Sequence, residues 1–481
     1  MESICSVDKQ FAIEIAALLK TPATHHAQDY FDDLIAKKEC STRLKVIVDG
    51  QFGKGLYADT DFKEAELVLK DQMLLGSQHP SNKMDCFVCS CCFRFLGSIE
   101  LQIGRKLYLQ SLGLCSGIQC NSDSSDGEHD SCVPEDANLG ECSTSASKAT
   151  ISLPEEVIES LTNGQMLLPY SEKFALPSEC PCPGGCGEEF YCSEMCAARD
   201  WETCHSLLCT GEKSKASRPE ALSKFLEHAN NTNDIFILAA KAISMTLLKY
   251  KFLKKAHLRE VGYITSNATT IDLSLLQEAW KPFSMGYKRR WWDCIALPED
   301  VDKSDEVAFR RQIKEMAFES LQLLKEAIFD VDCAPLFSLE IYGQIIGMFE
   351  LNNLDLVVAS PVEEYFLYID DLPGTEKKKA EAVTRPILNA LGDDYSICCQ
   401  GTAFFPLQSC MNHSCCPNAK AFKRDEDKDG QATIMAVRDI QRGEEVTVSY
   451  IDEELSYEER QRSLADYGFR CKCSKCSEEE S

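Results

Sequence analysis

The chain has 481 residues, and its 77 acidic side chains outnumber 50 basic ones, which gives a formal net charge of −27 at pH 7. At about 150 residues per domain this length predicts two to four domains. A hydrophobic fraction of 44% excludes a chain that is disordered throughout. The charge argues against binding to a nucleic-acid backbone, which requires clustered Lys and Arg, and favours a positively charged partner. An acidic surface that serves only solubility explains the same charge equally well.

The meaning of the cysteine content depends on the cellular compartment. The first residues lack the basic, apolar and small-residue pattern of a signal peptide. The most apolar run, residues 235–248, is shorter than the roughly 20 residues that a membrane helix needs. We therefore expect an intracellular protein without membrane contact. In a reducing compartment the 27 cysteines cannot be mostly disulfides, so close cysteine pairs favour metal binding or catalysis.

The predicted elements follow from hydrophobic periodicity along the chain. A short amphipathic helix is expected at residues 11–19, and alternating strands are expected in residues 43–80. Residues 121–142 carry seven acidic side chains and no Lys or Arg. This composition predicts a disordered linker, because such a stretch buries too little apolar surface. Helical periodicity returns in residues 218–260 and 304–329.

The C-terminal third combines short strand patterns with a last helix at residues 457–467, which leads into three closely spaced cysteines. These features divide the chain into six segments: an N-terminal helical segment (1–42), a first strand-rich part (43–85), a cysteine-rich part (86–209) that contains the acidic linker at about 121–150, a helical insert (210–334), a second strand-rich part (335–455) and a cysteine-rich tail (456–481).

Candidate metal ligands in the cysteine-rich part are arranged as four closely spaced pairs: Cys86 with Cys89, Cys182 with Cys186, Cys192 with Cys196, and His205 with Cys209. Structural zinc is held tetrahedrally by four thiolate or imidazole ligands, so these pairs suffice for two ions. Buried free thiols are the alternative interpretation. The ligand set can also shift by one member, because further cysteines lie nearby: Cys91, Cys92, Cys180 and Cys204.

These pairs resemble a MYND zinc finger, a module in which interleaved ligand pairs bind two zinc ions. The resemblance implies two ligand sets, Cys86, Cys89, Cys192 and Cys196 for one ion, and Cys182, Cys186, His205 and Cys209 for the other. The long stretch between the first pair and the second departs from the usual MYND pattern. Because MYND fingers commonly bind peptides, a peptide partner is expected at this finger.

The C-terminal third carries three separate motifs. The first is the run 412–418, Asn-His-Ser-Cys-Cys-Pro-Asn, and the second is a glycine-led alternating strand that ends at Tyr450. The third is the cysteine triplet of residues 471–476, which offers one ligand fewer than a structural zinc needs. Taken singly, His413 is typical of a structural histidine and Tyr450 of a half-buried packing residue.

Together and in this order, the three motifs resemble those of SET-domain protein lysine methyltransferases. Residues 53–58, Gly-Lys-Gly-Leu-Tyr-Ala, resemble the first motif of that family. A MYND-like finger inserted after it resembles the SMYD-type subgroup, and the run 407–415 resembles the plant trithorax-related SET proteins. The resemblance implies an α+β fold, with a mainly β SET core that forms a pseudoknot, an inserted zinc finger, a helical insert and a zinc-binding post-SET tail.

The resemblance also implies roles for single residues. It assigns contacts with S-adenosylmethionine to residues of both SET parts: Lys54, Gly55, Asn352, Asn412, His413, Tyr450 and Phe469. Asn353 fits one of these contacts nearly as well as its neighbour Asn352. A third zinc would be bound by one cysteine of the core and three of the tail: Cys415, Cys471, Cys473 and Cys476. This zinc would tie the tail to the core and complete the substrate channel.

The expected chemistry is methyl transfer to a lysine amine. A free lysine amine has a pKa near 10.4. A narrow channel that removes water from the ammonium lowers this pKa and favours the neutral nucleophile. The hydroxyl of Tyr450 is expected to orient the amine, which makes Tyr450 the catalytic residue. Most of the rate enhancement would come from alignment, which can be worth about 7–11 kcal/mol.

The sequence therefore predicts a histone or other protein lysine methyltransferase that acts on chromatin and uses S-adenosylmethionine and three zinc ions. Its substrate would be a histone tail or another lysine-rich protein, and no nucleic-acid binding is expected. A nuclear location follows from a histone substrate, with the cytoplasm as a second location. The alternative is a zinc-dependent interaction scaffold for basic partners whose SET core has lost catalysis.

Overall fold

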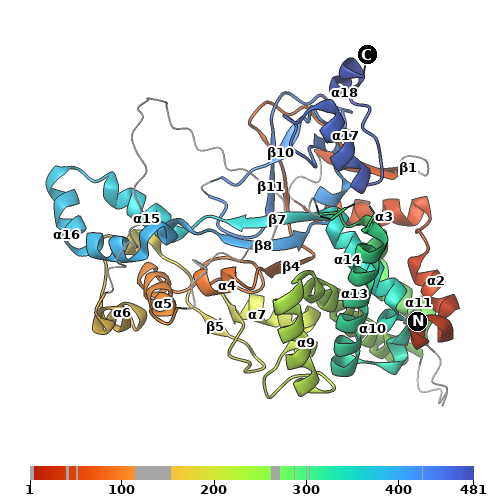
Figure 1. Ribbon diagram of the computed structural model, residues 1–481, viewed down its shortest axis with the longest axis horizontal. Helices are drawn as coiled ribbons and strands as arrows, with labels where there is room; N and C mark the ends of the chain where they lie inside the picture. Colours follow the sequence, from red (N-terminus) through yellow and green to blue (C-terminus); the bar gives the residue numbers. More distant parts are fainter. Residues whose placement is uncertain are drawn as a thin grey trace. The chain divides into compact units, whose positions relative to one another are not determined.

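The computed structural model describes residues 5–38, 43–49, 53–113, 153–261, 271–286, 288–298, 301–302, 304–424 and 426–480 (Figure 1). The acidic linker expected at about 121–150 lies outside these residues. The chain forms two compact units. The first contains Met1–Gly97, Leu176–Ala359 and Cys398–Ser481, and the second contains Ser98–Ala175 and Ser360–Ile397.

The described strands of the first unit form small sheets. Two sheets have three strands: β11 (Ala432–Ala436) lies between β3 (Leu67–Asp71) and β10 (Ala419–Ala421), and β8 (Cys399–Phe404) lies between β4 (Leu75–Gln78) and β7 (Asn353–Val358). The other described strands form two-stranded pairs: β1 (Leu44–Asp49) with β2 (Gly53–Ala58), β9 (Asn412–His413) with β12 (Thr447–Val448), and β5 (Cys180–Pro181) with β6 (Phe190–Tyr191). All pairs are antiparallel except β9 with β12, which is parallel.

These pairings join the two strand-rich parts of the chain into one core. Ile434 of β11 faces Leu69 of β3, and Phe404 of β8 faces Leu75 of β4. The alternation of the sequence matches β1, which is buried on one face, whereas β4 and β11 are buried along almost their whole length. The alternating pattern expected at 445–450 yields only the short strand β12, which begins two residues later than the pattern.

Helices at the N-terminus and in the insert surround a large apolar core in the first unit. They are α1 (Ser6–Gln10), α2 (Ala12–Leu19), α9 (Pro219–Thr232), α10 (Ile235–Val261), α11 (Leu273–Ser284), α12 (Trp291–Cys294), α13 (Glu306–Ile328), η3 (Val331–Phe337) and α14 (Leu339–Asn352). The same core includes Leu75 and Phe404 of the central sheet. The helical insert therefore packs directly on the sheet formed by β4, β8 and β7. The remaining N-terminal helix, α3 (Thr24–Ala36), packs in a second core with β1, β2, β3 and β11.

The second unit is helical in the residues that the structure describes. It contains α5 (Ile99–Ser111), α6 (Glu155–Thr162), η1 (Ser171–Phe174), α15 (Pro361–Asp370), α16 (Gly374–Leu391) and η4 (Gly392–Ser396). Its own core includes Ile103, Leu161 and Tyr365. Residues 360–397, which sequence analysis placed within the catalytic core, thus pack with residues 98–175.

The remaining helices of the first unit lie in the finger, in the tail and beside the strands. They are α4 (Asn82–Asp85), α7 (Glu194–Asp200), η2 (Trp201–His205), α8 (Ser206–Leu208), η5 (Gln408–Cys410), α17 (Tyr457–Asp466) and α18 (Ser474–Glu479). The expected mixture of helix and sheet is confirmed. Within the described ranges, no helix combines the length and apolar character needed to cross a membrane.

Candidate functional site

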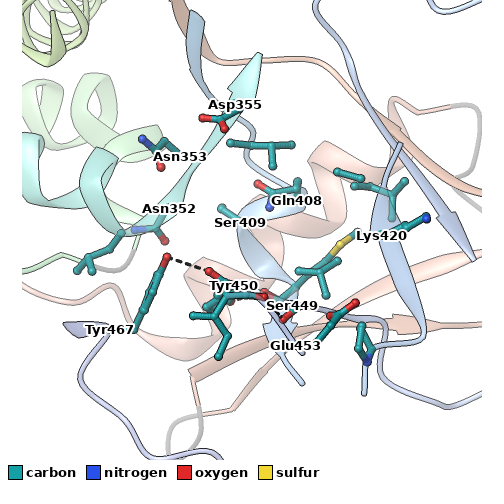
Figure 2. Close-up of a pocket in the computed structure, with 18 of the residues that line it drawn as sticks. Asn352, Asn353, Asp355, Gln408, Ser409, Lys420, Ser449, Tyr450, Glu453 and Tyr467 are labelled. Carbon is teal, nitrogen blue, oxygen red and sulfur yellow. Dashed lines mark hydrogen bonds between the residues drawn. The ribbon is translucent and has the colours of Figure 1, made fainter. Parts of the chain in front are cut away.

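A cavity of about 520 Å³ lies in the first unit, lined by the second strand-rich part and by Tyr467 of the tail (Figure 2). One wall is the start of β7, and others come from the turn 408–411, from β10 and from the residues that follow β12. The aromatic side chains of Tyr450 and Tyr467 line it, together with the carboxylates of Asp355 and Glu453. The cavity thus combines a tyrosine hydroxyl with negative charge.

Tyr450 is held in place by several contacts. Its hydroxyl donates to the carbonyl oxygen of Met411 at 2.5 Å, and its backbone N–H donates to Nδ1 of His413 at 3.0 Å. Tyr467 packs against its ring with 5.2 Å between ring centroids and donates to its carbonyl oxygen at 3.4 Å. Burial raises the pKa of Tyr450 well above its usual value. The phenol therefore keeps its proton, and its oxygen retains lone pairs that can accept a hydrogen bond.

The first SET-like motif meets the asparagine motif through β2 and β9. Asn412 Nδ2 donates to the carbonyl oxygen of Lys54 at 3.0 Å and to Oε1 of Glu445 at 2.7 Å. Lys54 Nζ donates to the carbonyl oxygen of Met285, which follows α11, at 3.2 Å. A Cβ at position 55 would lie only 2.6 Å from Oε1 of Glu445. Glycine at this position leaves the Glu445 side chain free to accept the hydrogen bond from Asn412.

His413 uses both ring nitrogens within the protein. Nδ1 accepts from the N–H of Tyr450, so Nε2 carries the ring proton and lies 3.2 Å from Sγ of Cys415. Burial, with a smaller effect of Arg460, lowers the pKa of His413 to about 4, which favours this neutral ring. The exposed ring of Phe469 lies 5.9 Å from that of His413. Any hydrogen bond from residue 413 to a ligand is therefore left to its backbone.

The expected cofactor residues fall into two sets around Tyr450. Asn352 lines the cavity at the end of α14 and donates from Nδ2 to the carbonyl oxygen of Met348 at 2.7 Å. Asn353 also lines it, so the geometry keeps both asparagines as candidates. The other set does not line this cavity and is connected through β2, β9 and the tail: Lys54, Gly55, Asn412, His413 and Phe469. Tyr450 contacts His413 and Phe469 of the second set and shares the lining of the cavity with the two asparagines.

Three groups of side chains could each hold a metal ion, with ligand atoms within 4.8 Å of one another. They are Cys89, Cys92, Cys192 and Cys196; Cys182, Cys186, His205 and Cys209; and Cys415, Cys471, Cys473 and Cys476. The second and third groups have the members expected from the sequence. The first contains Cys92 in the place expected for Cys86. Both Cys86 and Cys92 stand three residues from Cys89, so sequence spacing alone could not distinguish them.

The donor atoms of these groups fit tetrahedral zinc. Sulfur ligands at about 2.3 Å from zinc would stand about 3.8 Å from one another. The Sγ–Sγ distances are 3.5 Å for Cys92–Cys192, 3.8 Å for Cys182–Cys209 and 3.5 Å for Cys415–Cys476. Cys86, by contrast, is a buried residue whose carbonyl oxygen accepts a hydrogen bond from Gln78.

The third group is enclosed by polar partners from α17. Arg460 is 1% exposed, and its guanidinium lies 3.7 Å from Sγ of Cys476 and 2.6 Å from Oε2 of Glu479. Gln461 Nε2 lies 3.3 Å from Sγ of Cys476. N–H groups directed at thiolates offset negative charge, which four cysteine ligands would leave on a zinc site. The sequence contained no spacing signal for Arg460.

Comparisons with known proteins agree with this geometry. The SET domain family model matches residues 53–451. The histone-lysine N-methyltransferase ATXR2 of Arabidopsis thaliana is 62% identical over 481 residues, which are 100% of both chains. The protein-lysine N-trimethyltransferase SMYD5 of Homo sapiens is 36% identical over 144 residues, 28% of this chain and 31% of that protein. The histone-lysine N-methyltransferase ASHR1 of Arabidopsis thaliana is 27% identical over 216 residues, 42% of this chain and 43% of that protein. The chain therefore belongs to the SET-domain family of methyltransferases.

Proposed function

We propose that this chain is a histone lysine N-methyltransferase that acts in the nucleus on chromatin. The observation that carries the proposal is the position of Tyr450, whose fixed phenol lies between the cavity and the motifs of β2 and β9. The family, and the activity that ATXR2 is named for, support a histone lysine as the acceptor. The net charge of −27 suits a basic substrate.

The cavity supplies what a lysine side chain needs. Aromatic walls accommodate its methylene groups and an ammonium, and the carboxylates of Asp355 and Glu453 attract the cation. Removal of water inside the cavity lowers the pKa of the ammonium, so that a neutral amine forms by proton loss to solvent at the cavity mouth. The phenol oxygen of Tyr450 then accepts an N–H of this amine and directs the nitrogen lone pair.

The methyl donor would be bound on the other side of Tyr450, by Lys54, Gly55, the backbone of Asn412 and His413, and Phe469. When bound, S-adenosylmethionine supplies a methyl group on a positively charged sulfur, which the amine nitrogen displaces in line. Glycine at position 55 places no side chain beside Glu445 and Asn412. Asn352 or Asn353, at the cavity wall, is suited to a further contact.

The three ligand groups would hold three zinc ions with structural roles. In the first group we assign Cys92 as the ligand and leave Cys86 out, since Cys92 is the residue beside Cys192. The finger that contains two of the groups is proposed to bind a peptide partner. The third group would anchor the tail that carries Tyr467 and Phe469 next to Tyr450.

The proposal is tested by methyl transfer from labelled S-adenosylmethionine to core histones and to peptides of their tails. Tyr450→Phe is expected to lower kcat on the order of 100-fold, because the amine loses its alignment. Tyr108→Phe, at an exposed tyrosine of the second unit, is the control and should retain wild-type activity. Wild-type protein that binds S-adenosylmethionine but transfers no methyl group, or equal activity in Tyr450→Phe, would contradict the proposal.

A further inference from the structure

Gln408 presents an unpaired polar group at the catalytic cavity. It begins η5, lines the cavity and is only 9% exposed, so the side chain is about nine-tenths buried (Figure 2). Its Oε1 has no hydrogen-bond partner among the described residues. Leaving a buried amide oxygen unpaired costs about 1–3 kcal/mol. Of the described side chains with such an unpaired buried atom, Gln408 is the one that lines this cavity.

The position of Gln408 is set by its backbone. The N–H groups of Leu407 and Gln408 both donate to Oδ2 of Asp71, at 2.7 and 3.1 Å. Asp71 is itself buried and forms an ion pair with Lys38 at 3.0 Å. Because a buried carboxylate holds this turn, the carboxamide of Gln408 cannot leave the cavity wall by a shift of the main chain. The unpaired oxygen is therefore a fixed feature of the site.

The same turn carries the partner of the catalytic hydroxyl. The N–H of Met411 donates to the carbonyl oxygen of Gln408 at 2.9 Å, and the carbonyl oxygen of Met411 accepts the hydroxyl of Tyr450 at 2.5 Å. Gln408 and Tyr450 are thus connected through one residue and face one cavity (Figure 2). The carboxamide and the phenol therefore belong to walls of the same cavity.

The chemistry of the cavity selects a hydrogen-bond donor. The unpaired atom is an acceptor and the phenol oxygen of Tyr450 is a second acceptor. Three carboxylates line the cavity, those of Asp355, Asp452 and Glu453, against the one ammonium of Lys420, so the charge of the lining is negative. A lysine amine supplies two N–H groups when neutral and three when protonated. We propose that Oε1 of Gln408 accepts a hydrogen bond from the ε-amine of the substrate lysine and so selects for N–H groups on that nitrogen. This inference rests on the proposed function and adds a substrate-binding residue to it.

The test compares peptides that differ only at the target position. Using the histone-tail peptide that wild-type protein methylates, dissociation constants are measured by calorimetry for versions that carry lysine, trimethyl-lysine or norleucine. Trimethyl-lysine keeps the charge but has no N–H, and norleucine has no nitrogen. Gln408→Met removes the acceptor at similar volume, while Gln408→Glu retains one. Gln441→Met, at an exposed glutamine, is the matched control.

We expect Gln408→Met to weaken binding of the lysine peptide about tenfold relative to both analogues, which corresponds to one hydrogen bond. Gln408→Glu should preserve the preference for lysine, and Gln441→Met should leave all affinities unchanged.

If the ratios of the dissociation constants for the three peptides are unchanged in Gln408→Met, the inference is overturned. The proposed function stays intact in that case, because methylation by wild-type protein is recorded separately. A uniform loss of affinity for all three peptides, as a peptide-backbone contact or a structural role would give, also contradicts the inference. If wild-type protein neither methylates nor binds any histone-tail peptide, the proposed function fails and this inference fails with it.

Discussion

Two cysteine-rich regions of the first unit offer similar ligands but are embedded differently. In the finger, residues 86–97 and 176–209, the buried cluster is small and half of its members are ligand candidates: Cys89, Leu96, Cys182, Tyr191, Ala197 and Cys209. In the tail, the cluster around Cys415 and Leu464 includes Tyr450 and Tyr467 of the cavity. The finger has little apolar core besides its ligands, whereas the tail shares its core with the site.

Because the two regions are packed differently, a metal ion bound to similar ligands would stabilise different parts of the protein. A small fold without enough apolar core depends on metal for its own stability. A metal in the finger would therefore stabilise the finger itself. A metal in the tail would in addition hold the wall of the cavity, since Cys415 lies two residues from His413, which holds the backbone of Tyr450. Substitutions in the finger and in the tail test this difference.

The largest effect is expected from Cys473→Ser in the tail group. Loss of one ligand should release the tail and misplace the rings of Tyr467 and Phe469 beside Tyr450, so kcat/KM should fall on the order of 100-fold. Zinc content by mass spectrometry should drop by one ion per chain. Cys416→Ser, at the exposed neighbour of Cys415, is the control. Full activity in Cys473→Ser would show that the cavity wall stands without the tail group.

The next effect separates two cysteines with the same spacing in the finger. Cys92→Ser should lose one zinc and lower the thermal midpoint, while methyl transfer falls far less than in Cys473→Ser, because the finger group does not contact the cavity. Cys86→Ser should retain all zinc and cost only about 1 kcal/mol, as an ordinary buried substitution does. Loss of zinc in Cys86→Ser but not in Cys92→Ser would reverse our assignment of the ligand.

A smaller effect is expected from Arg460→Met, which affects the tail group alone. The substitution removes the N–H groups that face Cys476 and Glu479, and should cost about 2 kcal/mol in stability. Zinc release from one site to a chelator should become faster, while the two finger sites remain unchanged. Arg462→Met, at an exposed position of the same helix, should match wild type. Equal release rates from all three sites would argue against a specific contact.

The smallest effect concerns an ion pair that ties the finger to α4. Glu189 Oε1 lies 3.1 Å from Nζ of Lys83. Burial disfavours the charged carboxylate, but Lys83 and Lys241 outweigh it and lower the pKa of Glu189 from 4.5 to about 2. Since the folded-state pKa is depressed, the stabilisation is complete above pH 4.5 and is lost as pH falls toward 2.

Glu189→Gln should therefore lower stability by about 1 kcal/mol at pH 7, and the difference from wild type should disappear at low pH. Urea unfolding at several pH values measures this difference. Glu188→Gln, at the exposed neighbouring residue, is the matched control. A difference that stayed constant between pH 7 and pH 3 would contradict the assigned role of the ion pair.

Sequence reasoning located the parts of the site but not all of their members. The order of the motifs predicted that the segments of Asn412 and Tyr450 would meet, and the parallel pairing of β9 with β12 brings the backbone of Tyr450 to His413. The MYND resemblance named Cys86 as a ligand, whereas the structure groups Cys92 with Cys89, and the equal spacing of both to Cys89 explains the difference. Sequence reasoning also missed Gln408, since nothing in a linear pattern shows whether a glutamine in a polar run is buried.

The sequence also could not predict which helices form the core of the second unit. Their periodicity is local, but residues 98–175 and 360–397 share a core through contacts across more than two hundred positions, as between Ile103 and Tyr365. Local patterns contain no information about such partners.

By itself, the amino-acid sequence determined the residue types and their order: which side chains can bind metal, which stretches form helices or strands, and which motifs belong to a methyltransferase. Those properties depend on covalent spacing and on the alternation of apolar residues, which are local. The tertiary structure decided which cysteines share a site, that both nitrogens of His413 are engaged, and that Oε1 of Gln408 lies unpaired at the cavity. These outcomes depend on burial and on distances between remote segments, which arise only when the chain packs.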